Sequence, residues 1–234
     1  QGVSAIDPDF NTQWALLSNV QIERALSDDL SVSLGYINSI GRNMPVQLDT
    51  NLTATAATLA DGRPIYSSTR PNSTFNAIDV SQSIGQGSYN ALTATIGKRM
   101  RGGWQMQANY TLAKSTDNAP FPQYVLGAVN EDRISDPSNI DRDKGVAPFN
   151  QTHTFALSSL LQPKVSGDGF GARLANNNQL GVIIQANSGL PFSIRTNRDL
   201  NNDGNAANDR PIGIDRNAGR LGKVVNVDAR YVRF

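Results

Sequence analysis

Residues 104–112 read WQMQANYTL, a stretch in which apolar and polar side chains alternate at every position. The even positions carry Trp, Met, Ala, Tyr and Leu, whereas the odd positions carry Gln, Asn and Thr. Successive side chains of a β-strand point to opposite faces of its sheet, so this alternation predicts a strand with one apolar and one polar face. Helical spacing, with apolar residues three and four positions apart, does not fit the stretch.

The same alternation recurs along the whole chain. In residues 30–36, Leu, Val, Leu and Tyr alternate with Ser and Gly, and residues 14–26 follow the pattern with a few interruptions. Weaker alternation runs through residues 88–100, 152–161, 178–195 and 224–234. The Thr, Val, Ile and Tyr residues of these segments favour strands. We therefore predict an all-β, antiparallel fold with roughly seven long strands.

The connections between these segments alternate between short and very long. Ser27-Asp28-Asp29 and Arg101-Gly102-Gly103 are tight turns, whereas residues 41–73, 115–149 and 197–222 form long connections rich in Asn, Asp, Gly and Pro. Long loops without structure of their own are uncommon in compact soluble domains. Transmembrane β-barrels, in contrast, combine short periplasmic turns with long extracellular loops. The pattern predicts a segment of such a barrel, incomplete because even the smallest single-chain barrels need about eight strands.

Residues 74–83 also resemble a strand. One extra membrane crossing there would reverse the direction of every later strand and place the tight turns on opposite sides of the membrane. We therefore predict that these residues form an extracellular β-extension or hairpin and do not span the membrane.

The polar faces of the predicted strands carry Gln, Asn, Ser and Thr more than Lys and Glu, which suits a hydrated barrel lumen. Aromatic residues lie near strand ends, as in the interfacial girdles of membrane barrels. They are Trp14, Tyr36, Tyr89, Trp104, Tyr110 and Tyr231. The alternative is a soluble or cell-surface β-sandwich, in which the same apolar faces would form a buried core. Such a sandwich would be a binding or adhesion module, with calcium as a possible requirement.

Composition excludes several classes of function. The 234 residues include 21 basic and 20 acidic side chains, a net charge of +1, which argues against a nucleic-acid-binding surface. There is no Cys and a single His, so thiolate chemistry and sites built from several His residues are excluded. For His153 we expect a structural position at the outer interface of the barrel. No pairing of a nucleophile with a base is visible, and we predict that the chain is not an enzyme.

Six segments of the chain form a recognisable series. The clearest is the hairpin SYNALTATIGKRMRGGWQMQANYTLAKSTDNA at residues 88–119. The others are residues 14–45, GVAPFNQTHTF at 145–155, SGLPF at 188–192, DLNNDGNAANDRP at 199–211 and NVDARYVRF at 226–234. In their order and spacing, which cover nearly the whole chain, these segments resemble TonB-dependent outer-membrane transporters, specifically the Oar-like group.

This resemblance implies a barrel of about 22 strands with an N-terminal plug, energised through TonB and importing a scarce solute. The chain departs from that pattern because it has no recognisable plug or TonB-interacting segment, and because Phe234 falls within a strand. We therefore expect residues 1–234 to be part of one barrel domain in the bacterial outer membrane. Its expected partners are membrane lipid, an unidentified solute and, through other parts of the protein, the TonB complex.

One loop resembles a calcium-binding loop. Asp199, Asn201, Asp203 and Asn205 have the D-x-N-x-D-G-x-N spacing, in which oxygen ligands surround a hard cation. The carboxylate of the twelfth position is missing, and Asp209, one residue earlier, is the candidate substitute. A solvated Asn/Asp/Gly turn is the alternative. We expect no other cofactor.

The connection at residues 115–150 mixes acidic and basic side chains. They are Glu131, Asp132, Arg133, Asp136, Asp141, Arg142, Asp143 and Lys144. We consider two interpretations, a surface that contacts the solute at the outer mouth and a solvated loop held by weak surface ion pairs.

Overall fold

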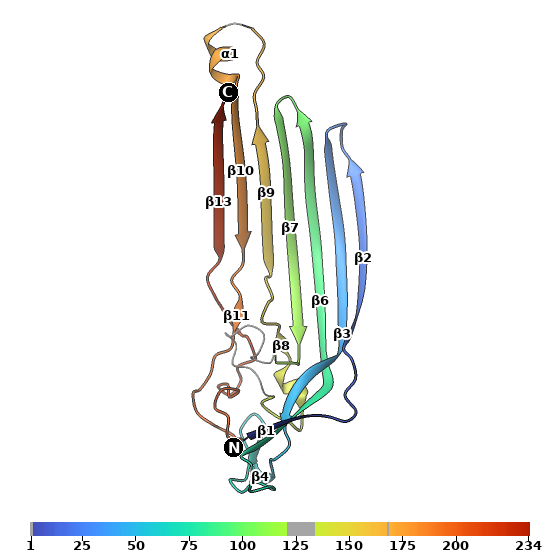
Figure 1. The fold of residues 1–234 in the computed structure, drawn as a ribbon, viewed down its shortest axis with the longest axis vertical. Coiled ribbons are helices and arrows are strands. Elements are labelled where there is room, and N and C mark those ends of the chain that lie inside the picture. Colours follow the sequence, from blue (N-terminus) through green and yellow to red (C-terminus); the bar gives the residue numbers. More distant parts are fainter. Residues whose placement is uncertain (1, 121–133, 168) are drawn as a thin grey trace.

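The computed structural model describes residues 2–120, 134–167 and 169–234. Its main element is one curved sheet of seven long strands, each antiparallel to its neighbours (Figure 1). In their order across the sheet they are β2 (Trp14–Ala25), β3 (Leu30–Asp49), β6 (Ala77–Arg101), β7 (Trp104–Asp117), β9 (His153–Leu161), β10 (Asn178–Asn187) and β13 (Val224–Arg233). Among the described residues, β2 and β13 each have only one neighbour, so the sheet does not close. The predicted all-β antiparallel fold and its incomplete barrel are confirmed.

The remaining elements are short. Six strands and a 3₁₀ helix lie at the long-loop end, at the bottom of Figure 1, and helix α1 lies at the opposite end. Their bounds are β1 (Gly2–Ile6), β4 (Ala54–Thr58), β5 (Pro64–Tyr66), η2 (Ile140–Asp143), β8 (Gly145–Val146), α1 (Phe170–Ala175), β11 (Pro191–Phe192) and β12 (Gly219–Arg220). In the described parts of the chain, no helix is long and apolar enough to cross a membrane.

The two predicted tight turns lie at the same end of the sheet. Gly102 and Gly103 between β6 and β7 have φ angles of 63° and 79°, which glycine adopts most readily. A Cβ atom on Gly103 would lie 2.2 Å from the carbonyl oxygen of Gln162, so the close approach of the next connection also requires glycine there. That connection, residues 162–177, is longer than the other two at this end and contains α1, which the sequence analysis did not anticipate.

The segment at 74–83 forms a β-extension, as predicted. Most of it is the first part of β6, which is a single strand of 25 residues. This part pairs with the end of β3, where Val46 is the partner of Gln82, and on its other side with the parallel strand β1. The register of β3 against β6 shifts between Arg42 and Val46, and β3 and β6 bend together beyond the sheet (Figure 1). Residues 74–83 therefore add no further crossing of the membrane.

Cross-strand register shows that the two faces of the sheet differ along its whole width. Cross-strand partners share a face. One row consists of Ile22, Leu34, Ala94, Tyr110, Phe155, Ala186 and Val225. The adjacent row, on the other face, consists of Glu23, Ser33, Thr95, Asn109, Ala156, Gln185 and Asn226. One face is therefore continuously apolar and the other is predominantly polar.

The apolar face is not covered by a second sheet. Val20 and Ile22 are 70% and 73% exposed, and Leu34 is 67% exposed. A soluble β-sandwich buries such side chains between two packed sheets. In the described residues the only other sheets are two-stranded pairs at the long-loop end. The sandwich alternative is therefore wrong, and the apolar face requires a nonpolar environment.

Candidate functional site

The exposed side chains of the apolar face form a band across the strands, which we call the apolar band. This band ends in a charged cluster near the tight turns. Lys98 lies on the apolar face, opposite Leu30 and Met106, and its ammonium group forms an ion pair with Asp29. The Lys98 Nζ atom lies 5.5 Å from the centre of the Trp104 ring, a cation–π geometry. The hydrogen bond from Lys98, together with one from Ser27, lowers the pKa of Asp29 to about 2. A Lys that folds back toward an aromatic ring and a carboxylate is typical of a membrane interface.

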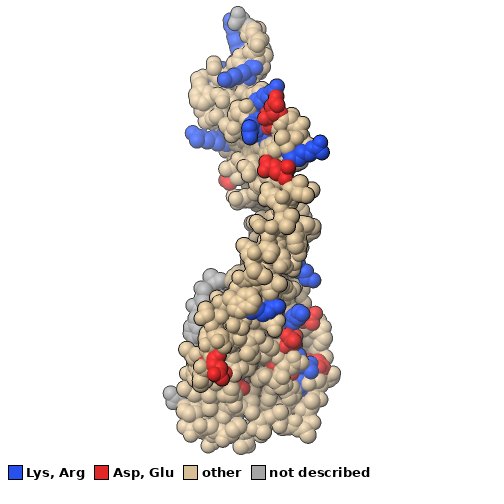
Figure 2. Space-filling model, turned by 90° about the vertical axis from the view of Figure 1, so that its right-hand side faces the viewer, with Lys and Arg blue, Asp and Glu red and all other residues tan. Residues whose placement is uncertain are grey.

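The other end of the band is marked by a polar row. The Tyr36 hydroxyl donates to Asn90 Oδ1 at 2.6 Å, and Asn38 Nδ2 donates to the same atom at 2.9 Å. On β6 the two boundary residues, Asn90 and Lys98, and the seven residues between them make nine residues in all. A transmembrane β-strand needs about 9–11 residues, so the band matches the thickness of a membrane. Figure 2 shows charged side chains gathered near both ends of the molecule and very few over the middle of the sheet.

His153 belongs to the polar boundary near the long loops. Its Nδ1 atom lies 2.7 Å from the Tyr110 hydroxyl, and the two rings stack with their centres 6.2 Å apart. His153 pairs across the strands with Leu112, which places it on the apolar face. This position agrees with the structural role expected for it at the outer interface.

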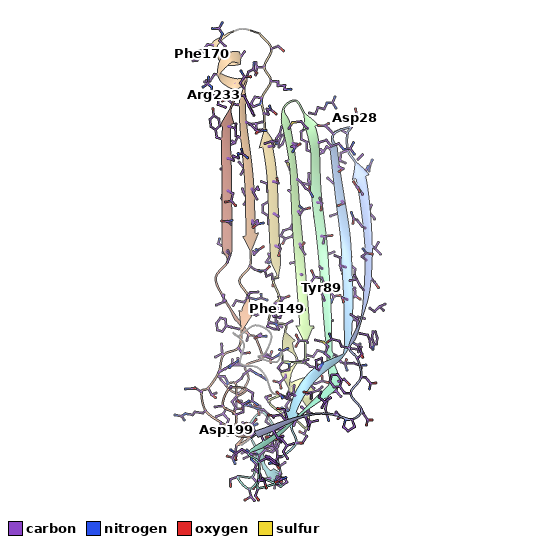
Figure 3. The ribbon with its side chains drawn as sticks, viewed as in Figure 1. Asp28, Tyr89, Phe149, Phe170, Asp199 and Arg233 are labelled. Carbon is purple, nitrogen blue, oxygen red and sulfur yellow. The ribbon has the colours of Figure 1, made fainter. Side chains whose placement is uncertain are left out.

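The polar face carries a cavity at its long-loop end, with a volume of about 560 Å³. Tyr89 from β6, Thr111 from β7 and Thr154 from β9 line its wall, and Phe149 and Asn150 line it from the preceding loop. Tyr89 therefore lies on the lumen face, and its predicted place in the interfacial girdle is wrong. Figure 3 shows Tyr89 and Phe149 near this end of the sheet. Hydroxyl and amide groups beside aromatic rings can hydrogen-bond and stack with a polar solute.

The long loops fold into one cluster with a small apolar centre. Val46 and Leu48 from β3 are buried against Ala119 and Ile134 from the loop at 115–149. Met44 and Ile140 pack on the outside of this centre. The end of β3 therefore attaches the first two long loops to each other.

Buried ion pairs join the loops further. The side chain of Arg216 is 0% exposed, pairs with Asp117 and donates to the carbonyl oxygen of Asp143 at 2.8 Å. Arg210 pairs with the carboxylate of Asp143 at 2.6 Å, and that carboxylate also accepts from the backbone and hydroxyl of Ser135. These contacts tie the loop at 197–222 to the loop at 115–149.

A second set of ion pairs ties in the loop at 41–73. Arg63 forms ion pairs with Asp61 at 2.9 Å and with Asp209 at 2.6 Å. Arg142 pairs with Asp136 at 2.7 Å, and Asp136 is 1% exposed. Burial of Asp136 and Asp143 contradicts the interpretation of residues 115–150 as a solvated loop with weak surface pairs, although Asp141 and Lys144 are exposed. Glu131, Asp132 and Arg133 lie outside the described residues.

The predicted calcium residues form a compact turn held by its own hydrogen bonds. Asp199 Oδ1 and Asn201 Oδ1 both accept from the backbone N–H of Asp203, and Asp203 Oδ1 accepts from that of Asn205 at 2.7 Å. Asp209 accepts from the backbone N–H of Leu200 at 2.6 Å, besides its ion pair with Arg63. In the described residues, no three acidic or His side chains converge as a metal site. Calcium binding stays a prediction.

Burial changes the chemistry of one carboxylate in this turn. Asp203 is 5% exposed, and this burial raises its pKa to about 6, with repulsion from Asp199 and Asp209 adding to the effect. Hydrogen bonds from Asn208 and Asn205 oppose the shift. Burial also raises the pKa of Asp209, against the hydrogen bond from Leu200 and the charge of Arg63.

These features define a class of protein. A single antiparallel sheet with an exposed apolar band, polar boundary residues on both sides and a polar opposite face is the wall of an outer-membrane β-barrel. The chain belongs to the outer membrane beta barrel domain family, whose model matches residues 1–231. No curated protein and no solved structure matches it. The predicted location in the bacterial outer membrane is confirmed.

Family membership also gives the wall its orientation. Outer-membrane barrels place short turns in the periplasm and long loops outside the cell. The ends of β2, β3, β6 and β7 at residues 25–30 and 101–104 therefore face the periplasm, and the folded loop cluster is extracellular. The apolar face contacts lipid and the polar face lines the lumen.

Proposed function

We propose that this chain forms part of the wall and the extracellular loops of a TonB-dependent transporter of the Oar-like group. The supporting observation is the lumen face, whose cavity at the outer mouth combines Tyr89, Phe149 and several hydroxyl and amide groups. The resemblance of the six sequence segments supports the choice of this group among outer-membrane barrels. The transported solute is unidentified.

The lumen wall is suited to the passage of a polar solute. Its central row consists of Ser, Thr, Asn, Ala and Gln on β3, β6, β7, β9 and β10. Side chains of this kind offer weak, exchangeable hydrogen bonds that do not trap a solute. The ion-paired loop cluster would hold the mouth in a fixed shape, which lowers the entropic cost of binding there.

The proposed role is passive and includes no catalysis. His153, the single His of the chain, lies on the lipid-facing surface and not beside the lumen cavity. Energy for uptake would come from the TonB complex, through contacts that lie outside these 234 residues. No nucleic acid takes part.

Uptake by intact cells tests this proposal. Cells that express the whole transporter should take up one member of a panel of labelled siderophores, glycans, peptides and cofactors. Deletion of the gene and removal of TonB should each abolish that uptake. The replacement Tyr89→Ala should reduce it severalfold, whereas Tyr36→Ala, on the lipid face of the neighbouring strand, should not. Uptake that persists without TonB would contradict the proposal.

A further inference from the structure

A small polar cavity of about 210 Å³ lies just beyond the outer boundary of the apolar band. Six strand residues line it, Arg42, Gln86, Gly87, Ser88, Thr116 and Asp117, and four of them share one face: Arg42, Gln86, Ser88 and Thr116. Arg42 is the cross-strand partner of Gln86, and Ser88 is the partner of Thr116. All four lie an even number of positions from lipid-facing residues of their own strands, so they continue the lipid-facing surface. Ser88 and Thr116 also border the cavity on the lumen face.

The cations at this cavity differ in their ion pairing from the cations of the loop cluster. Arg42 and Lys144 line the cavity, and Lys114 lies two positions before Thr116 on the same face. None of these three side chains forms an ion pair with a carboxylate of the described residues, whereas Arg63, Arg210 and Arg216 all do. Within the described parts of the chain, the Arg42 side chain donates one hydrogen bond, to the carbonyl oxygen of Gly41 at 2.9 Å.

The acidic groups near the cavity are already engaged. Asp141 Oδ1 accepts a hydrogen bond from Asn118 Nδ2 at 2.8 Å. Asp117 is paired with the buried Arg216. Among the described residues, three cations thus face the boundary with one carboxylate, Asp141, to offset them, which leaves a positive charge for a ligand to neutralise.

The height of Lys114 and Thr116 corresponds to lipid headgroups. Lys114 is level with Asn90, where the apolar band ends, and Thr116 lies two residues, or about 7 Å, further out. The headgroup region of a bilayer extends about 5–8 Å beyond the hydrocarbon on each side. Arg42 is the partner of Gln86, and Lys144 precedes Gly145, the partner of Asp117, so both start about four residues, or about 14 Å, beyond Asn90. Their long side chains reach back toward the headgroup level.

We propose that Arg42, Lys114 and Lys144, with the hydroxyl and amide groups of Ser88, Thr116 and Gln86, bind a phosphorylated glycolipid of the outer leaflet. We call these six residues the rim site. The cations neutralise a phosphate group, and the neutral groups hydrogen-bond to the adjoining sugar. The inference depends on the barrel fold and its orientation, and it holds whether or not the protein is a TonB-dependent transporter.

Native mass spectrometry of the intact, detergent-purified membrane protein tests the rim site. The probes are synthetic lipid A with two phosphates, the same lipid without phosphate, and inorganic phosphate. We expect the phosphorylated lipid to bind at least tenfold more tightly than its dephosphorylated form. A cation near the surface contributes about fivefold in affinity for an anionic lipid, so R42Q/K114Q/K144Q should weaken binding on the order of 100-fold.

Two further variants keep the test decisive. Lys164 is an exposed Lys at the periplasmic end, so K164Q removes one charge and should leave lipid binding unchanged. The single variant K114E changes an exposed side chain and should still weaken binding if the triple variant fails to fold. Equal binding of both lipids, an effect of K164Q as large as that of K114E, or displacement of the lipid by equimolar inorganic phosphate would each overturn the proposal.

Discussion

The wall and the loop cluster of this protein are stabilised in opposite ways. In the wall, Val20 and Ile22 leave about seven-tenths of their surface exposed, and nearly all charges lie at the two boundaries. In the cluster, Arg216, Asp143 and Asp209 are at most 1% exposed. The wall therefore depends on lipid and on strand pairing, whereas the cluster depends on its own ion pairs and hydrogen bonds. Changes in the two regions should have separable effects.

The largest effect is expected for Arg216→Ala in the cluster. Removal of one partner from a buried ion pair costs about 3–5 kcal/mol, because the remaining charge is buried without compensation. Hydrogen exchange of the folded barrel should show the loops at 115–149 and 197–222 losing protection while β6 and β7 keep theirs. Arg198→Ala, which changes an exposed Arg of the same loop, is the control. Equal loss of protection in the wall would show that the two regions are not independent.

Among changes in the wall, a charge at the centre of the apolar band should lower its stability most. Leu34 is paired with Ala94, the middle of residues 90–98, and Leu34→Lys should cost about 2–4 kcal/mol in a lipid bilayer. Ser33→Lys places the same charge on the lumen face of the same strand and should cost far less. Folding titrations of the intact barrel in lipid vesicles measure both. Similar costs for the two variants would contradict the assignment of the faces.

The stability of the loop cluster should depend on pH because Asp203 titrates within it. Because burial raises its pKa from 3.8 to about 6, its contribution to stability is complete below pH 4 and is lost as the pH rises through 6. This loss is on the order of 2 kcal/mol. Asp203→Asn should therefore flatten the pH dependence of loop protection between pH 4 and 7. An unchanged pH profile in the variant would show that another group is responsible.

The smallest effect is expected from calcium. Extracellular calcium sites commonly have dissociation constants of about 0.1–1 mM, so 1 mM calcium would stabilise the cluster by about 0.4–1.4 kcal/mol. Calorimetry on the intact protein should detect binding heat that EDTA prevents and that Asp203→Ala removes. The absence of heat, or heat that persists in the variant, would favour a turn that is held by its own hydrogen bonds without calcium.

Sequence predicts the wall well because its signal is local. A period of two fixes which side chains share a face, and the row from Ile22 to Val225 follows from it without knowledge of the loops. The position of residues 74–83 also follows, because strand direction must alternate. The row itself extends over residues far apart in the chain, but each strand carries its own part of the pattern.

The loop cluster could not be predicted in the same way. Arg63 and Asp209 are 146 positions apart, and Arg210 and Asp143 are 67 positions apart. No spacing rule connects such pairs, so Asp136 and Asp143 resemble solvated carboxylates in the sequence although they are buried. The sequence predicts a calcium loop or a solvated turn at residues 199–205, but the burial of Asn201 and Asp203 and the internal hydrogen bonds depend on backbone geometry that composition does not specify.

The unbroken length of β6 determines how far the protein projects from the cell. The 13 residues from Ala77 to Tyr89 continue the strand beyond the apolar band. At about 3.3 Å per residue they extend up to about 43 Å, a distance comparable to the thickness of a whole bilayer. The β4–β5 hairpin and its neighbours are therefore carried away from the membrane surface, within reach of an antibody or a phage tail approaching from the medium.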